Sequence, residues 1–367
     1  MRLCGIVLRA QRRISKPALL VIICLLCALH VFPKYFEKQG NRSWKNPWNQ
    51  IQKPPGKVLI LSSYRSGSSL MGELVATTST RTMYEFEPTY QAFSSKAHLD
   101  SDYRSQKCSD ILNLIFNCSE HYSEEQFNQL LPLRFFSPTS YQVMKIFNTD
   151  WGDSFHWEKN PTDTEDVKEY VKFICRESSL KLVKTIRLPV LDFYTMFNLL
   201  YTLLEKFDDL VIIGVVRDPR DSFASRKKFG GGPGFEETPM SLNQICKNYS
   251  SIINFVKAIK TGPHTSRVSL VKYEEFYNDP INLIAKTFSQ LSLPVGEKTI
   301  NYIKLNVMNE KGGDLENTAK HGLFTKPRDK NATIGYWRAL KIDPEVLEES
   351  AECIAEYEEA KSTAHQT

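Results

Sequence analysis

Two segments far apart in the chain each run a short apolar strand into a turn that suits an anion. Residues 57–75 read KVLILSSYRSGSSLMGELV, and residues 208–229 read DDLVIIGVVRDPRDSFASRKKF. The first turn holds small hydroxyl residues, one Arg and Gly67, and it opens a helix. Free N–H groups and the positive end of the helix dipole converge at such a turn, while glycine lets the backbone approach closely. The second, cationic turn predicts a ligand with a second anionic group, as in a nucleotide with phosphate at both ends.

Apolar strands and amphipathic helices alternate along the rest of the chain. The strand candidates are residues 58–62, 82–86, 141–147, 181–186, 210–217 and 268–273. Helical patterns cover 191–207 and 241–260, and Asp-Pro pairs at 279–280 and 343–344 each offer an N-cap followed by proline. This alternation predicts an α/β fold with a parallel sheet buried between helices, in a single domain. The region 92–140 shows no such pattern and reads as irregular.

The amino-terminal part of the chain predicts a membrane anchor. Residues 17–32 are apolar apart from His30, and residues 1–16 carry five cations and no carboxylate. The positive-inside rule then places the tail in the cytosol, and the stem 33–56 and the domain 57–367 in the lumen. The apolar run is shorter than the about 20 residues of a typical span. A cleaved signal peptide is the alternative, but no small-x-small cleavage site closes the run.

Basic and acidic residues balance outside the cytosolic tail. Removing the tail's 5 cations from the 47 Lys and Arg residues leaves 42, against 42 Asp and Glu residues. A neutral domain argues against bulk nucleic-acid binding, so an acidic ligand must be held by local clusters of cations.

Asparagine and cysteine usage fits a lumenal domain. Four Asn-x-Ser/Thr sequons, each open to glycosylation in the lumen, lie at Asn41, Asn117, Asn248 and Asn331.

Five cysteines follow the anchor, at positions 108, 118, 175, 246 and 353. Cys108 and Cys118 are near enough in sequence to form a small disulfide loop. Because five is an odd number, at least one cysteine stays free or pairs with a second chain, as in a homodimer. The spacing does not resemble a zinc site.

The two turns resemble the 5′-phosphosulfate loop and the 3′-phosphate site of Golgi carbohydrate sulfotransferases, which use 3′-phosphoadenylyl sulfate (PAPS). The resemblance is to the galactose, N-acetylglucosamine and N-acetylgalactosamine 6-O-sulfotransferase group in particular. Further segments support it in the same order: MYEFEPTY (83–90), LKLVKTIRLP (180–189), VSLVKYEEF (268–276) and ATIGYWRAL (332–340). RSGSS alone is a weak signal. Together with R-D-P-R-x4-S-R and the strand between them it is specific, and the similarity covers about residues 57–355.

The resemblance implies a fold, a reaction and a place in the cell. The fold would be the P-loop-like parallel sheet of PAPS-dependent sulfotransferases. The enzyme would transfer sulfate from PAPS, without a metal, to the 6-hydroxyl of a Gal, GalNAc or GlcNAc residue. The acceptor glycan would sit on a glycoprotein, proteoglycan or glycolipid at the Golgi membrane, with the catalytic domain lumenal.

Three other functions compete with this reading. One is a sulfotransferase acting on another glycan hydroxyl, of heparan or dermatan type. Another is a P-loop nucleotide kinase, against which stands the absence from the sequence of G-x4-G-K-[ST] and of a clear magnesium-binding Walker-B Asp. The third is a non-catalytic glycan-binding relative.

The resemblance also assigns roles to the residues of the first turn. Sulfuryl transfer needs a held donor, stabilisation of charge on the leaving phosphate and removal of a proton from the attacking hydroxyl. The cradle for the 5′-phosphosulfate would be Arg65, Ser66, Gly67, Ser68 and Ser69. Arg65 would neutralise the bridging oxygen as the bond breaks, and in principle cations and backbone N–H groups make a metal unnecessary. An ordinary turn with Ser69 capping a helix is the alternative reading.

The second turn matches the family's 3′-phosphate site at Arg217 and Ser225. The helix that follows the strand would carry Ser225 inward. Arg220 and Arg226 either assist there or form surface ion pairs with nearby aspartates.

A carboxylate for proton transfer is expected at Glu87, which follows the strand-like TMYEF and precedes a proline. Parallel sheets bind ligands at the carboxyl ends of their strands, and the family counterpart of Glu87 lies near the acceptor hydroxyl. Glu85 is the rival base, because on a strand it would point to the same side. Lys184 and Arg187 are candidates for the acceptor's anionic groups or the donor's sulfate. On a strand they face opposite ways, so both line the cleft only if the strand has ended by residue 187.

Overall fold

The computed structural model describes residues 54–89, 92–93, 101–118, 175–228, 236–308, 334–338 and 342–363. All of them lie in the larger of two compact units, Lys53–Thr367. The predicted anchor 17–32, the predicted strand 141–147 and the sequons Asn41 and Asn331 lie outside the described residues. Within the described ranges, no helix combines the length and the apolar character that crossing a membrane requires.

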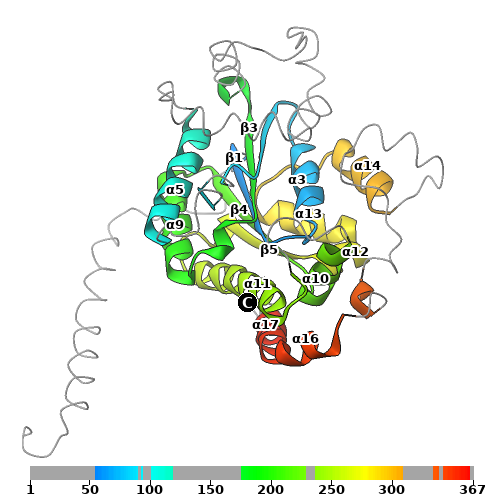
Figure 1. Cartoon of the computed structure of the whole chain (residues 1–367). Coiled ribbons are helices and arrows are strands. Elements are labelled where there is room, and N and C mark those ends of the chain that lie inside the picture. The colour runs from blue at the N-terminus through cyan, green and yellow to red at the C-terminus, as the bar shows by residue number, and fades with distance from the viewer. Residues whose placement is uncertain are drawn as a thin grey trace, which may run out of the picture. The chain divides into compact units, whose positions relative to one another are not determined.

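Five parallel strands form one sheet, in the order β2-β3-β1-β4-β5 (Figure 1). They are β1 Lys57–Ser62, β2 Thr82–Phe86, β3 Leu180–Thr185, β4 Leu210–Val216 and β5 Val268–Lys272. The central strand β1 pairs with β3 and β4, so that Leu59 lies opposite Val183 on one side and Ile212 on the other. Every strand that was predicted within the described residues is present, with its ends within one residue of the prediction. The expected parallel sheet is confirmed.

Helices cover both faces of this sheet, which explains why its strands are apolar on both sides. One face carries α3 Ser68–Ala76, α12 Tyr273–Asn278, α13 Pro280–Gln290 and α14 Glu297–Asn306. The other face carries α5 Ser101–Asn117, α9 Phe193–Lys206 and α11 Pro239–Lys260. Close to α11 lie α10 Pro219–Lys228, α16 Pro344–Glu349 and α17 Ala351–Thr363. Short 3-10 helices are η2 Leu188–Val190, η3 Thr265–Arg267 and η5 Tyr336–Arg338.

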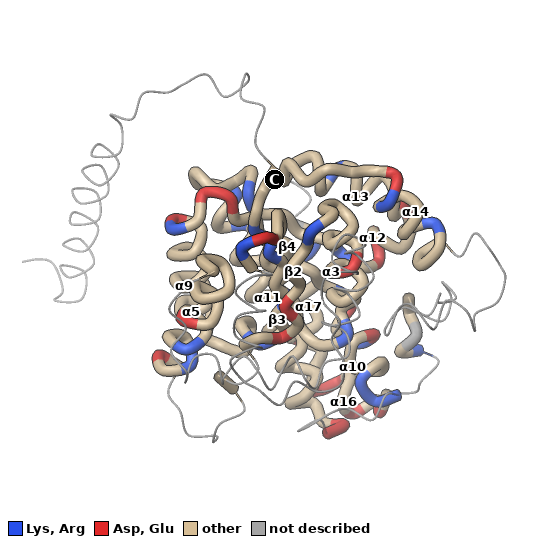
Figure 2. The backbone as a smooth tube through the Cα atoms, turned by 90° about the horizontal axis from the view of Figure 1, so that it is seen from above, with Lys and Arg blue, Asp and Glu red and all other residues tan. Residues whose placement is uncertain are grey.

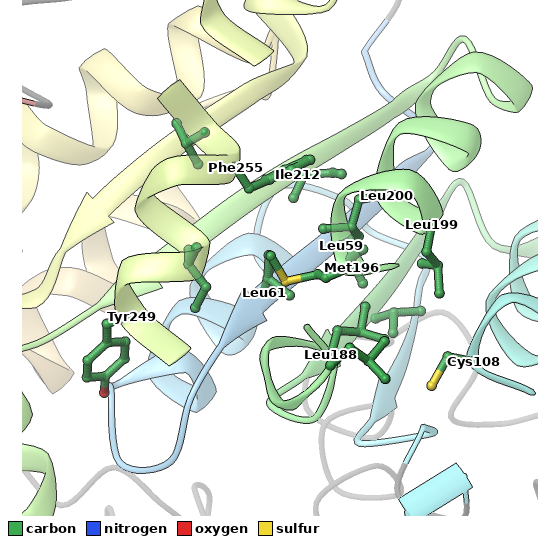
Figure 3. Packing of buried hydrophobic residues seen from close by; sticks show 14 of the residues in the cluster. Leu59, Leu61, Cys108, Leu188, Met196, Leu199, Leu200, Ile212, Tyr249 and Phe255 are labelled. Atoms are coloured by element: carbon green, nitrogen blue, oxygen red, sulfur yellow. The ribbon is translucent and has the colours of Figure 1, made fainter. Parts of the chain in front are cut away.

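Alternating side chains of β1 divide the hydrophobic core into two layers. Val58 and Ile60 are fully buried in the layer beneath α3 and α13. Leu59 and Leu61 are fully buried in the layer beneath α9 and α11. Figure 3 shows Leu59 and Leu61 beside Met196 of α9 in this second layer. The strand that leads into the first turn is thus held from both faces, and the turn starts from a rigid base.

The expectation that residues 92–140 are irregular is wrong where α5 lies. The buried face of α5 includes Ile111, Leu112 and Ile115, which join the core layer that α9 also enters. These positions share one face of a helix. The scattered aromatic residues around the segment hid this helical pattern in the sequence.

The predicted Cys108–Cys118 disulfide is also wrong. The disulfide joins Cys118 to Cys175, and Cys108 is a buried free cysteine. Cys108 lies within α5 and Cys118 follows its last residue. The rise of 1.5 Å per helical residue therefore separates the two along the helix axis by about 15 Å, too far for a disulfide.

Two predicted helix starts are confirmed by their caps. At α13, Asp279 Oδ1 accepts a hydrogen bond from the Asn282 N–H at 3.4 Å. At α16, Asp343 Oδ1 accepts one from the Glu345 N–H at 3.0 Å. In both cases the next residue is a proline at the first helical position, where its missing N–H costs nothing.

The sequon at Asn248 conflicts with the structure. Its side chain lies within α11, is 2% exposed and contacts Ser63 Oγ at 3.2 Å. A glycan on this amide does not fit the folded chain, because the attachment point faces the interior. Asn117, at the end of α5, is exposed and accommodates one.

Candidate functional site

The first and second turns lie side by side because β1 and β4 are neighbouring parallel strands. At the ends of these strands Ser62 is paired with Val215. The Arg65 Nε donates a hydrogen bond to Ser225 Oγ at 3.1 Å, and Arg217 Nη1 donates one to the Arg65 carbonyl at 3.1 Å. The structure therefore brings the two segments of the sequence into direct contact at one edge of the sheet.

The first turn depends on left-handed backbone conformations. Gly67 has φ 89° and precedes α3, whose first residue is Ser68. A Cβ on Gly67 would lie 2.4 Å from ring atoms of Tyr273, so glycine also makes room for this ring. Arg65 adopts φ 60°, which is unfavourable for a residue with a Cβ and is typical of functional sites. The backbone N–H groups at the start of α3 lie at this turn, where an anion would accept their hydrogen bonds.

Hydroxyl groups beneath the turn hold it on β1. Ser66 is fully buried, and its Oγ accepts a hydrogen bond from the Ser68 N–H at 3.3 Å. Ser62 Oγ contacts Ser66 Oγ and lies 2.6 Å from the Val215 carbonyl of β4. These bonds join the turn to both strands that carry the site.

A cavity of about 330 Å³ opens over the first turn. This volume lies within the range of small-molecule sites, about 300–1,000 Å³. The cavity is lined by Tyr64, Arg65, Ser66, Gly67, Ser68, Ser69, Leu70, Phe86, Glu87, Lys184, Ile186, Arg187, Tyr273, Tyr277 and Asn306. All five residues of the predicted cradle are present, together with Glu87, Lys184 and Arg187. Arg217 and Ser225 are not among the described residues that line it; they contact Arg65 instead.

Glu87 and Lys184 form a buried ion pair in this cavity. Lys184 Nζ lies 2.6 Å from Glu87 Oε1, and the Ile186 N–H donates a hydrogen bond to Glu87 Oε2 at 3.1 Å. Glu87 is 7% and Lys184 is 4% exposed. Lys184 Nζ also lies 3.9 Å from the centroid of the Phe86 ring. Because burying a lone charge is costly, each of these charged groups stabilises the other in this position.

Glu85 does not share the position of Glu87, contrary to the expected alternation. β2 ends at Phe86, and Glu87 has φ 56°, so the period of two no longer applies to it. Glu85 stays within the strand opposite Val183, is buried, and is not among the described residues that line the cavity. The cavity geometry thus favours Glu87 over its rival.

Lys184 and Arg187 line the same cavity because β3 ends at Thr185. Arg187 Cζ lies 5.1 Å from the centroid of the Tyr64 ring, and Arg226 Cζ lies 4.3 Å from the same centroid. The pKa of Arg226 is lowered by burial and by the Arg187 charge. Basic residues end α10, in blue in Figure 2, and Arg226 is one of them. The Tyr64 ring is thus in contact with two cations of the site, Arg187 and Arg226.

The second turn is fixed by ionic and backbone contacts. Arg217 is 3% exposed, and its Cζ lies 4.8 Å from the centroid of the Tyr273 ring. Arg220 forms ion pairs with Asp218 at 2.7 Å and with Glu358 of α17 at 3.2 Å. Of the two roles considered for Arg220, the structure shows the ion pair with a nearby aspartate.

Helix α10 is also tied to the segment around η5. Asp221 Oδ2 accepts a hydrogen bond from the Gly335 N–H at 2.8 Å, and its Oδ1 accepts one from the Trp337 N–H at 3.0 Å. Arg220 Cζ lies 4.9 Å from the centroid of the Trp337 ring. The described part of ATIGYWRAL, residues 334–338, therefore packs against the helix that carries Ser225.

Tyr273, Tyr277 and Asn306 line the cavity but were not predicted as site residues. They come from α12 and α14, which follow β5. Tyr273 had a signal in the sequence, since it is an aromatic residue directly after a buried strand. Asn306 ends an ordinary amphipathic helix and had none. Among the residues that the structure describes, no group of three or more His, Cys, Asp or Glu could hold a metal ion.

Known proteins are similar to most of the length of this chain. The chain matches the family described as "Sulfotransferase domain" over residues 55–357. A Danio rerio protein named "Carbohydrate sulfotransferase 1" is 24% identical over 329 residues, covering 79% of this chain and 74% of that protein. The Mus musculus protein of the same name is 23% identical, and the match covers 77% of this chain and 73% of the length of that protein. The solved "Sulfotransferase Domain from the Synechococcus PCC 7002 Olefin Synthase" aligns with a TM-score of 0.43 and 16% identity, covering 86% of this chain and 98% of that one.

Proposed function

The chain belongs to the sulfotransferase domain family, and from this we propose that it transfers sulfate from PAPS to a hydroxyl group of a glycan. Similarity to relatives named carbohydrate sulfotransferase supports a sugar acceptor. The resemblance of the motifs supports the 6-hydroxyl of a Gal, GalNAc or GlcNAc residue as the site of transfer. The proposal rests mainly on one observation. The first and second turns, each of which could bind an anion, are joined by the hydrogen bond from Arg65 to Ser225.

The donor has one anionic group on each side of its ribose, and each turn would hold one of them. The first turn, with Arg65 and the N–H groups at the start of α3, would bind the 5′-phosphosulfate. Serine hydroxyls at positions 66, 68 and 69 and the backbone at Gly67 complete this cradle. Arg217 and Ser225 would bind the 3′-phosphate. This arrangement suits the donor because Arg65 contacts both residues of the second turn.

The reaction would be an in-line displacement at sulfur. The acceptor hydroxyl oxygen forms a bond to sulfur while the bond from sulfur to the phosphate oxygen breaks. Adenosine 3′,5′-bisphosphate (PAP) leaves, and Arg65 with the backbone N–H groups stabilises the charge on its 5′-phosphate. Glu87 accepts the proton of the hydroxyl, because among the described residues that line the cavity it is the one with a carboxylate.

Lys184 would connect the base to the group that is transferred. Its ammonium group is 2.6 Å from Glu87 Oε1 and lines the same cavity as Arg65. The negative sulfuryl oxygens would attract this ammonium group when the donor is bound. Sharing Lys184 with the sulfuryl group would leave Glu87 freer to accept a proton at the moment of attack.

The acceptor would carry a negative charge near the hydroxyl that reacts. Arg187 lines the cavity, and Arg226 lies on the same Tyr64 ring. Two guanidinium groups against one tyrosine ring favour a sulfate or carboxylate of the glycan. The glycan could be part of a glycoprotein, a proteoglycan or a glycolipid.

We also propose a lumenal domain of a single-pass type II protein in the Golgi membrane. The cationic tail and the apolar run 17–32 support this orientation. The Cys118–Cys175 disulfide fits an oxidising compartment. A homodimer and the absence of nucleic-acid binding remain predictions from the sequence.

Incubating the full chain with radiolabelled PAPS and a panel of neutral and sulfated glycans tests the reaction. Label should appear on the 6-hydroxyl of an acceptor, and label on another hydroxyl would favour the heparan or dermatan alternative. Thermal melts test the ligand class: PAP should stabilise the chain without magnesium. Stabilisation by Mg·ATP but not by PAP would instead show a kinase and overturn the proposal.

A further inference from the structure

The C-terminal helix α17 packs along α11, and each helix places a cysteine in their contact. Cys246 of α11 is 0% exposed and Cys353 of α17 is 8% exposed. The Cys353 thiol lies 3.5 Å from the Asn243 carbonyl, one turn before Cys246. Tyr249 and Tyr357, on the following turns of the two helices, have ring centroids 6.0 Å apart. Figure 1 shows α17 lying next to α11.

The two thiols interact across this helix contact, and their pKa values shift in opposite directions. The pKa of Cys246 is raised, because its thiol donates to Cys353 and because it is buried. The pKa of Cys353 is lowered, chiefly because the Cys246 thiol donates a hydrogen bond to it. Cys108, the remaining free cysteine in the described part of the chain, has its pKa raised to about 12 by burial alone. Cys353 is therefore the most nucleophilic of these three thiols.

We propose that Cys246 and Cys353 form a second disulfide, which fastens α17 to α11. The oxidant would be a disulfide of a small thiol or of an oxidoreductase. The Cys353 thiolate attacks one sulfur of that disulfide and releases the first thiol. Cys246 then loses its proton and attacks the Cys353 sulfur, releasing the second thiol. Two protein thiols are thereby oxidised, and the external disulfide is reduced to two thiols. The chain already holds one disulfide, Cys118–Cys175, so its cysteines meet such oxidants.

The bond would stabilise the second turn through α17. Glu358 of α17 pairs with Arg220 at 3.2 Å, and Arg220 pairs with Asp218 in the turn at 2.7 Å. The carbonyl of Lys361 accepts a hydrogen bond from Lys272 Nζ at 3.0 Å. Helix α17 thus contacts the end of β5 and the start of α10, and a covalent bond near its start would limit its separation from both.

Peptide mapping of the full chain tests the bond directly. The protein is incubated with glutathione disulfide, denatured with an alkylating agent but no reductant, and digested with trypsin. A disulfide-linked pair of peptides 229–247 and 342–361 is expected, with Cys108 alkylated. Finding both Cys246 and Cys353 alkylated while the Cys118–Cys175 link is intact would overturn the proposal. The assay needs no sulfate transfer, so its outcome is independent of the proposed function.

Thermal melts supply a second measurement. Cys118→Ala/Cys175→Ala, which lacks the first disulfide, should still lose about 5–10 °C in Tm on reduction, because opening a second long loop costs stability. Adding Cys246→Ala and Cys353→Ala to it should abolish this response. Adding Cys108→Ala instead should leave it unchanged. A Tm of the Cys118→Ala/Cys175→Ala protein that is indifferent to reductant after glutathione treatment would contradict the bond.

Discussion

Arg65 and Ser225 are 160 residues apart in sequence, and a hydrogen bond of 3.1 Å joins their side chains. The backbone carbonyl of Arg65 accepts a second bond, from Arg217. One residue of the first turn therefore contacts both proposed ligands of the 3′-phosphate. This relationship makes Arg65 the point at which the two halves of the donor site depend on each other.

Arg65→Ala should lower the rate of sulfate transfer by at least about 100-fold, the loss typical of removing a group that stabilises charge in a transition state. PAP affinity should fall as well, because Ser225 loses its side-chain partner, whereas the bond from Arg217 to the backbone carbonyl of residue 65 remains. Steady-state kinetics and PAP titration measure the two effects. Arg81→Ala is the matched control, since Arg81 forms an exposed pair with Glu177 away from the cavity. Wild-type turnover in Arg65→Ala would remove the first turn from the mechanism.

Ser225→Ala should weaken PAP binding by about 10- to 100-fold, the range for a hydrogen bond to a charged group. The turnover number at saturating PAPS should change little, because the 3′-phosphate takes no part in bond breaking. Calorimetry with PAP checks the affinity. Ser222→Ala provides the contrast: its hydroxyl contacts Tyr249 Oη at 2.8 Å within the core, so stability should fall while PAP affinity holds. Equal PAP affinity in Ser225→Ala and wild type would exclude the assigned contact.

Glu87→Gln should reduce the turnover number by about 100- to 10,000-fold, as expected for the loss of a general base. The amide keeps the shape of the side chain, so PAP affinity should stay within a few-fold of wild type. Lys184 loses its ionic partner, and Tm should therefore fall. Glu85→Gln serves as control because Glu85 is buried in β2 outside the cavity lining. If Glu85→Gln loses turnover and Glu87→Gln does not, the assignment of the base is wrong.

The sequence predicts those parts of the site that local patterns determine. Arg217 directly follows an apolar strand and Arg65 lies in the turn after another, so their place at the carboxyl edge of a parallel sheet could be expected. The pairing of Lys184 with Glu87 could not, because it depends on the register of β2 against β3 and on the left-handed φ of Glu87. Asn306 reaches the cavity only through the packing of α14.

The cysteines show the same limit of local reasoning. Proximity in sequence favoured Cys108 and Cys118, but the helix that separates them directs Cys118 to a partner 57 residues away, Cys175. A pattern of spacing cannot predict such pairings until the helices between the cysteines are known.

Arg187→Ala should discriminate between acceptors. Its KM for a sulfated glycan should rise about five- to tenfold, since a charge-assisted contact to the acceptor is lost. Its KM for the neutral counterpart and its PAP affinity should stay close to wild type. Arg81→Ala again serves as control, because it removes a cation outside the cavity. An equal rise in KM for both glycans would show that Arg187 does not recognise an anionic group of the acceptor.

Gly67→Ala should disable the first turn even though it adds one methyl group. The position has φ 89°, and the new Cβ would lie 2.4 Å from the Tyr273 ring. Strain of this kind costs about 1–3 kcal/mol, and displacement of Tyr273 would also disturb the cavity wall and Arg217. Chemical denaturation and PAP titration should both show a loss. Gly262→Ala is the matched control, because its Cβ would meet only the Ile259 carbonyl at 3.6 Å. Unchanged PAP affinity in Gly67→Ala would mean that the donor does not bind over this turn.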